Sequence, residues 1–154
     1  MAHYRTRIFD AITTRLSSIP DFSGVGHVSR ARTAALTVKQ LPAITATWSE
    51  RQETVTVRPC ADLNGEDGYD RRLPIDLIVH FQKGDPDVEF DRLAVLVEKA
   101  LGTAIKLDGL VIELTLSECR HYIDRATGIS LGVGALTYIA DYKTVASDPE
   151  TAAL

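Results

Sequence analysis

The sequence lacks most of the features from which a function can be inferred directly. It contains two cysteines, Cys60 and Cys119, which are too few for a disulfide framework, so we expect free thiols. No apolar run approaches the ~20 residues that a membrane-spanning helix needs. The N-terminus also lacks the apolar run of a secretory signal. These absences predict a protein that is made and kept in a cytoplasm, unless it is assembled into a particle.

Motifs for nucleotides and metals are also missing. Gly24-Val-Gly26 and Gly132-Val-Gly134 match nucleotide-binding loops only in fragments, because neither has the further glycine or lysine that holds a phosphate. The second fragment falls within an expected strand, where it indicates a bulge or a close backbone approach. A metal site would need a ligand spacing that is absent from the chain. We therefore expect no cofactor and no metal.

One cluster could carry chemistry. Cys119-Arg-His121, followed by Asp124, supplies the thiol, imidazole and carboxylate of an activated nucleophile. Cys119 and His121 share a strand face only by alternation, and no oxyanion loop or third ligand is evident. Structural residues on a hairpin are the favoured interpretation, and His80 is likewise read as a satisfied histidine. The prediction is that the protein is not an enzyme; the alternative is a small hydrolase using Cys119 and His121, with His80 as a further candidate.

Charge is unevenly distributed along a chain of ordinary globular composition. The 154 residues are 45% hydrophobic and 25% charged, which suits one domain with one core. The first 40 residues carry six basic and two acidic side chains, a net charge of +4, whereas the whole chain has −4 and the remainder therefore −8. The net acidity argues against nucleic acid as the main partner.

The charge split allows two interpretations. Opposite faces of the protein could meet in copies of the chain, because complementary potentials guide encounter and register, or the charges could be solvated surface of both signs. In the first case one interface surface is basic and the other is acidic. The candidate interface residues are Arg30, Arg32 and Lys39 on the basic side and Asp62, Glu66, Asp67 and Asp70 on the acidic side.

A strand–helix–strand unit at residues 73–116 organises the chain. Apolar and other residues alternate over residues 73–81 and again over residues 110–116, which predicts two strands with one face each toward a core. Between them, Asp85 suits a helix N-cap and Pro86 the first helical position. Apolar residues then recur at helical spacing to residue 101. A helix with one apolar face needs a sheet to cover.

The rest of the chain adds one helix and several strands to this unit. A helix is expected over residues 3–19, ended by Pro20. Strands are expected over residues 25–32, 41–48 (with Trp48 facing the core), 54–58, and in a hairpin of residues 110–123 and 129–144; residues 59–72 read as a long polar loop. The fold class is therefore α+β, an antiparallel or mixed sheet with two helices packed on it. One domain is predicted over residues 1–146, followed by a frayed, flexible tail over residues 147–154.

This order of elements resembles the tail terminator family of long-tailed bacteriophages, typified by minor tail protein U. The resemblance spans residues 3–144 and depends on the order and spacing of several segments. The loop of residues 60–69 and the tail past Thr144 depart from the pattern. The similar segments are Arg7-Ile-Phe-Asp-Ala-Ile12, Leu41-Pro-Ala-Ile44, Ile75-Asp-Leu-Ile-Val-His-Phe81 with the helix of residues 85–101, Tyr122-Ile-Asp-Arg-Ala-Thr-Gly128, and Ala135-Leu-Thr-Tyr-Ile-Ala-Asp-Tyr142.

The resemblance implies a structural virion protein. Family members form a hexameric ring that caps the head-proximal end of the tail tube, stops its polymerisation and offers a docking surface to the head connector. The expected partners are further copies of the chain, the tail tube protein and the head-completion or connector protein. No membrane and no sequence-specific nucleic-acid contact are expected, although DNA can pass through the ring. The expected location is the virion, after assembly in the host cytoplasm; the tail type stays open, and another neck or tail-completion protein is the nearer alternative.

Overall fold

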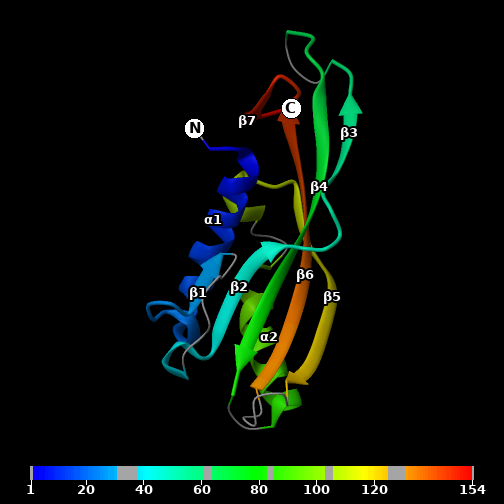
Figure 1. Ribbon diagram of the computed structural model, residues 1–154. Helices are drawn as coiled ribbons and strands as arrows, with labels where there is room; N and C mark the ends of the chain where they lie inside the picture. Colours follow the sequence, from blue (N-terminus) through cyan, green and yellow to red (C-terminus); the bar gives the residue numbers. More distant parts are fainter. Residues whose placement is uncertain are drawn as a thin grey trace.

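The computed structural model describes residues 2–30, 38–60, 64–82, 85–102, 106–124 and 131–153. These residues form one seven-stranded mixed sheet with two α-helices, which confirms the predicted α+β class (Figure 1). The elements are α1 (Tyr4–Ser17), η1 (Pro20–Phe22), β1 (Val28–Arg30), η2 (Val38–Gln40), β2 (Ala43–Trp48), β3 (Thr54–Arg58), β4 (Gly68–Phe81), α2 (Pro86–Ala100), η3 (Lys106–Gly109), β5 (Glu113–Asp124), β6 (Leu131–Val145) and β7 (Asp148–Ala152).

The long strands β4 and β6 lie at the centre of the sheet. The strand order is β1-β2-β4-β6-β5; only β1 and β2 run parallel, and every other described pair is antiparallel. β3 joins β4 beyond the end of β2, on the same edge, and β7 joins β6 beyond the end of β5. One half of the β4–β6 ribbon is thus flanked by β2 and β5, and the other half by β3 and β7.

Both helices cover the same face of the sheet. The ring of Tyr4 in α1 stacks on Tyr142 at 5.7 Å between centroids, and Phe90 in α2 stacks on Phe81 at 6.3 Å. Tyr142 is the register partner of Arg71, which lies ten residues before Phe81 on β4 and hence points to the same face. We call this the helix face and the opposite side the open face. The core lies between the helices and the helix face.

Local sequence explains where the helices begin and what they bury. In α2 the Asp85 carboxylate accepts a hydrogen bond from the Asp87 N–H at 3.0 Å, with Pro86 as the first helical residue, as predicted. In α1 the cap is the Nδ1 atom of His3, which accepts from the Arg5 N–H at 3.1 Å. The buried side chains recur at helical spacing and are Tyr4, Ile8, Phe9, Ile12 and Leu16 in α1 and Phe90, Leu93, Ala94 and Val97 in α2.

Two glycines of β6 let the aromatic rings reach the sheet. A Cβ atom on Gly132 would lie 2.0 Å from the Phe81 ring, and one on Gly134 would lie 2.0 Å from the Phe90 ring. The close backbone approach predicted from Gly132-Val-Gly134 is therefore confirmed.

Three expectations were wrong. The polar loop expected over residues 59–72 is shorter, because β4 already begins at Gly68 and pairs with β3 there. The expected frayed tail contains β7, which pairs with β6 and whose Glu150 carbonyl accepts a hydrogen bond from Arg7 at 3.3 Å. Trp48 is not a core residue: it ends β2 with 39% of its surface exposed. The turn between the two strands of the expected hairpin lies almost wholly outside the described residues. No helix in the described ranges is long and apolar enough to cross a membrane.

Candidate functional site

Three of the acidic residues predicted for an interface, Glu66, Asp67 and Asp70, lie at the end of the molecule where β3 meets β4. Glu66 accepts a hydrogen bond from the Ser147 hydroxyl at 2.9 Å, and Asp67 accepts one from the backbone N–H of Cys60 at 3.3 Å. Asp70 pairs with Arg58 at 3.0 Å. All three carboxylates thus have partners within their own chain, and Asp62 lies outside the described residues.

Arg30, one of the basic residues predicted for an interface, lies far from this end. Arg30 ends β1, and its guanidinium lies over the Phe9 ring at 3.8 Å, where burial lowers its pKa against an opposing effect of Asp10. Through Ala46, Arg30 aligns with Leu77 of β4, seven residues or about 23 Å along the strand from Asp70. Lys39 is exposed in η2, and Arg32 lies outside the described residues. The structure therefore keeps Arg30 and Asp70 apart on one subunit.

A buried carboxylate that the sequence did not reveal lies between them. Glu53 precedes β3, and its side chain is only 6% exposed. Its Oε2 atom is 2.6 Å from Arg5 of α1 and 3.2 Å from Arg71 of β4, and its Oε1 atom accepts a hydrogen bond from the Tyr142 hydroxyl of β6. Burial, followed by this bond to Glu53, raises the pKa of Tyr142. The Glu53 network therefore joins three elements and the segment between β2 and β3.

Aromatic contacts extend the Glu53 network to the surface. The Arg5 guanidinium lies 4.5 Å above the ring of Trp48, and Arg71 lies 5.4 Å from the ring of Tyr69. Nothing in the local sequence indicates that Glu53 is buried, because its burial requires α1 to return to the sheet. The network fixes the position of the strand that follows it, β3.

The strand β3, which follows Glu53, exposes two large apolar side chains. Val55 is 47% exposed and Val57 is 57% exposed, and both point to the helix face, because their register partners are Arg71 and Tyr69. Together with Trp48 they form what we call the β3 patch, namely Trp48, Val55 and Val57. Val55 and Val57 are neighbours on one face of their strand, and adjoining exposed apolar side chains are a feature of interaction sites.

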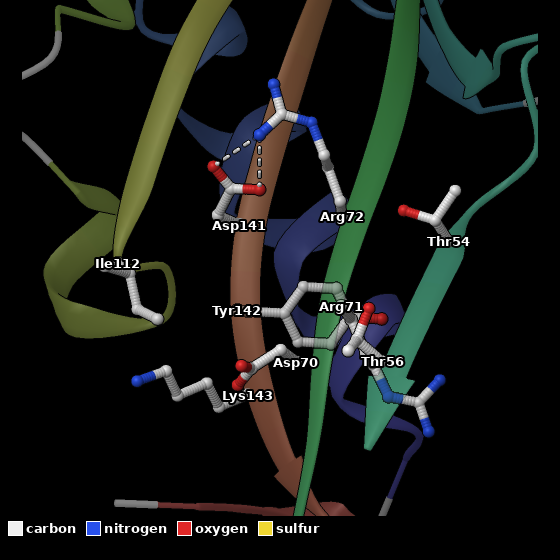
Figure 2. Close-up of a pocket in the computed structure, with 9 residues that line it drawn as sticks. All are labelled: Thr54, Thr56, Asp70, Arg71, Arg72, Ile112, Asp141, Tyr142 and Lys143. Carbon is white, nitrogen blue, oxygen red and sulfur yellow. Dashed lines mark hydrogen bonds and ion pairs between the residues drawn. The ribbon is translucent and has the colours of Figure 1, made fainter. Parts of the chain in front are cut away.

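The open face carries a trough of about 320 Å³ next to β3 (Figure 2). Arg72 bridges both carboxylate oxygens of Asp141 at 3.4 Å across its floor. Burial raises the pKa of Asp141, and the charge of Arg72 opposes that shift. The lining mixes charges of both signs with hydroxyls and one exposed apolar side chain. This composition is suited to contact with the surface of another protein. The lining residues are Thr54, Thr56, Asp70, Arg71, Arg72, Ile112, Asp141, Tyr142 and Lys143.

Cys119 and His121, the residues considered for catalysis, both lie on the helix face of β5. Cys119 is exposed, but partial burial of its thiol, followed by the charges of Glu98, Asp91 and Glu118, raises the pKa of the thiol. This shift disfavours the nucleophilic thiolate. The His121 Nδ1 atom is 3.2 Å from Asp87. The His121 ring stacks on Phe90 at 5.4 Å and Phe81 at 6.2 Å, so it packs at the start of α2.

The structure describes the remaining candidate residues only in part. His80 is half-buried on the open face. The side chain of Asp124 lies outside the described residues. Among the residues that the structure describes, no three His, Cys, Asp or Glu side chains are grouped closely enough to hold a metal ion.

Comparison with known proteins supports the fold. No family model matches the sequence, and no curated protein matches it. Among solved structures, the chain is similar to a chain of the virion of a native gene transfer agent particle, with a TM-score of 0.55 and 14% sequence identity. The similarity covers 86% of this chain and 91% of the other. At this identity the likeness shows a common fold, and it extends over nearly the whole of both chains.

Proposed function

We propose that this protein is a structural component of a phage-like virion. The observation that carries the proposal is the fold it shares, over 86% of its length, with a chain from a gene transfer agent virion. The same comparison covers 91% of that chain. A common fold over whole chains supports a common kind of role more strongly than a shared motif would, although fold alone does not determine function.

Within such a particle, we propose the role of tail terminator. The sequence segments that resemble that family are its support, because they occur in the same order and span residues 3–144. In this role copies of the chain form a hexameric ring on the head-proximal end of the tail tube. The ring ends polymerisation of the tube protein and presents its other side to the head connector.

The proposed activity is recognition without chemistry. The Cys119 thiol has a raised pKa, and the His121 ring is stacked between α2 and the sheet, an arrangement unsuited to a nucleophile and its base. The surfaces that could recognise other proteins are the β3 patch, the trough of the open face and the acidic end around Asp70. A protein that acts by binding alone requires only such surfaces.

Removing the gene from a producing strain tests the role. Without a terminator, tail tubes should grow to irregular lengths and stay separate from DNA-filled heads, and added purified protein should restore joining. Uniform tubes that still fail to join heads would assign the chain to another neck or tail-completion step. Normal, infectious or DNA-transferring particles would overturn the virion role altogether. Negative-stain images of purified protein should show rings with a central channel.

A further inference from the structure

The strand β3 has one paired edge and one open edge. It pairs antiparallel with β4, from Thr54 opposite Arg72 to Arg58 opposite Gly68. Within the part of the chain that the structure describes, no strand pairs with residues 54–57 on the other side. Figure 1 shows β3 at the margin of the sheet. An open edge presents a row of backbone N–H and C=O groups that a further strand can satisfy.

Other edge strands of the sheet carry features that discourage pairing, whereas the first four residues of β3 do not. Natural edges are blocked by charged side chains, proline, bulges or very short strands. β5 has a bulge between Leu116 and Glu118, and Arg120 follows on the same strand. β7 contains Pro149 between two acidic residues, and β1 has only three residues. Residues 54–57, Thr-Val-Thr-Val, contain neither a charge nor a proline.

The exposed edge is also held rigidly. Glu53, immediately before β3, is fixed by Arg5, Arg71 and Tyr142, so the strand does not need to be ordered when a partner binds. Preorganisation of this kind lowers the entropic cost of association. A rigid, unprotected and apolar edge is therefore suited to strand addition.

We propose that two copies of this chain pair through β3, antiparallel about a two-fold axis at Thr56. Val55 then lies opposite Val57 of the partner subunit, and Thr56 lies opposite Thr56 of the partner subunit. Cross-strand pairs of these types are favourable, and no like charges face each other, because Arg58 lies opposite the partner's Thr54. β3 is its own best partner, since the other described edges are protected.

Neighbouring registers are less favourable. A two-fold at Val57 would bring Pro59 of the partner subunit into the paired stretch, where it can donate no hydrogen bond. A two-fold at Val55 would draw Glu53 out of its buried network. Only the register centred on Thr56 uses all five residues of β3.

This contact goes beyond the proposed ring and does not depend on it. Contacts within a cyclic ring join two different surfaces, whereas the β3 contact joins two identical ones. Five paired residues a side amount to less than a standard interface of roughly 1,600 Å², so we expect a concentration-dependent equilibrium between monomer and dimer. The contact belongs to free subunits or to two assemblies that meet face to face.

Sedimentation velocity over a range of concentrations tests the contact. Val55→Lys with Val57→Lys should weaken dimer formation at least tenfold, because lysine blocks an edge strand. The control is Val88→Lys with Val95→Lys, two valines of α2 that are comparably exposed, at 66% and 48%. This control should dimerise like the wild type. Equal association of both variants would overturn the proposal.

Crosslinking tests the register and detects even a weak dimer. In a Cys60→Ser, Cys119→Ser background, Thr56→Cys should form a disulfide-linked dimer on mild oxidation, because directly opposed strand residues lie within disulfide range. Thr54→Cys is the control, since its counterpart in the partner subunit would be four residues or about 13 Å away along the strands. Absence of the Thr56→Cys dimer, or equal crosslinking of both variants, would overturn the proposal. A ring made through other surfaces would crosslink neither.

Discussion

The hydroxyl of Tyr142 donates a hydrogen bond to the carboxylate of Glu53, although the two residues lie 89 positions apart in the chain. The bond ties the longest strand, β6, to the segment that leads into β3. Arg5 and Arg71 complete the coordination of the same carboxylate. A buried carboxylate with three partners makes the whole group sensitive to the loss of any one member.

We therefore expect Glu53→Ala to lower the free energy of unfolding by about 2–3 kcal/mol, because it leaves two arginines without their partner in a mostly buried site. Tyr142→Phe should cost about 1–2 kcal/mol, since the carboxylate keeps both arginines. Urea denaturation followed by circular dichroism measures both values. The control is Glu118→Ala, which breaks an exposed pair with Arg51 at 2.9 Å and should cost under about 1 kcal/mol. Equal losses for Glu53→Ala and the control would mean that the network adds no stability.

The packing of α2 leads to a second prediction. Leu93 and Val97 are fully buried beneath the helix, so Leu93→Ala and Val97→Ala should each destabilise the fold by about 2–4 kcal/mol through the cavity they leave. Val95 lies on the same helix but is 48% exposed, and Val95→Ala should change stability by less than about 0.5 kcal/mol. Chemical denaturation of the three variants measures the difference. Unchanged midpoints for Leu93→Ala and Val97→Ala would contradict the packing described for α2.

The sequence predicted those parts of the fold that depend on interactions between residues close together in the chain. The start of α2 is set by Asp85 and Pro86, which act on their immediate neighbours, so it was predicted correctly. The burial of Glu53 and the exposure of Trp48 depend on where α1 meets the sheet, which no local pattern records. β7 was missed because backbone hydrogen bonds and Arg7 hold it, while its five residues include no large apolar side chain.

The candidate interaction surfaces were likewise predictable only where they depend on local sequence. The charge split along the sequence predicted one basic and one acidic surface, and the structure places Arg30 and Asp70 far apart along the sheet. It could not show that Arg58 already neutralises Asp70, or that Arg30 lies over Phe9. The β3 patch was missed, because Val55 and Val57 read as an ordinary strand until their open edge is seen.

A third prediction concerns the cap of α1. Burial, followed by the charges of Arg5 and Arg71, lowers the pKa of His3, while Glu53 and Glu150 act in the opposite direction. The unfolded chain therefore binds a proton at His3 more readily than the folded protein does. The stability that His3 contributes is fully present above its unfolded pKa of about 6.5 and is lost as pH falls through its lower folded pKa. Protonation also removes the Nδ1 lone pair that caps Arg5.

The variant His3→Asn tests this dependence, because asparagine can cap the helix but does not titrate. The stability of the wild type relative to His3→Asn should fall between pH 7 and pH 5. Carboxylates such as Asp141, whose pKa is raised by burial, titrate in both proteins and cancel in the comparison. Thermal denaturation at a series of pH values gives the difference. Parallel curves for the two proteins would show that His3 is not coupled to folding.

The last prediction returns to the ring and its charged surfaces. If basic and acidic regions of neighbouring subunits meet, Arg30→Glu with Arg32→Glu should shift the assembled protein toward monomer. Exposed pairs contribute under about 1 kcal/mol each, so the effect depends on repetition around the ring. High salt should act in the same direction, since such pairs are screened within about 10 Å at 0.1 M.

Arg51→Glu with Lys99→Glu changes the net charge equally and is the control. Because Arg30 also lies over Phe9, circular dichroism must first show an intact fold. Sedimentation that is unchanged by the reversal and by salt would assign the charge split to contacts with the tube or the head instead.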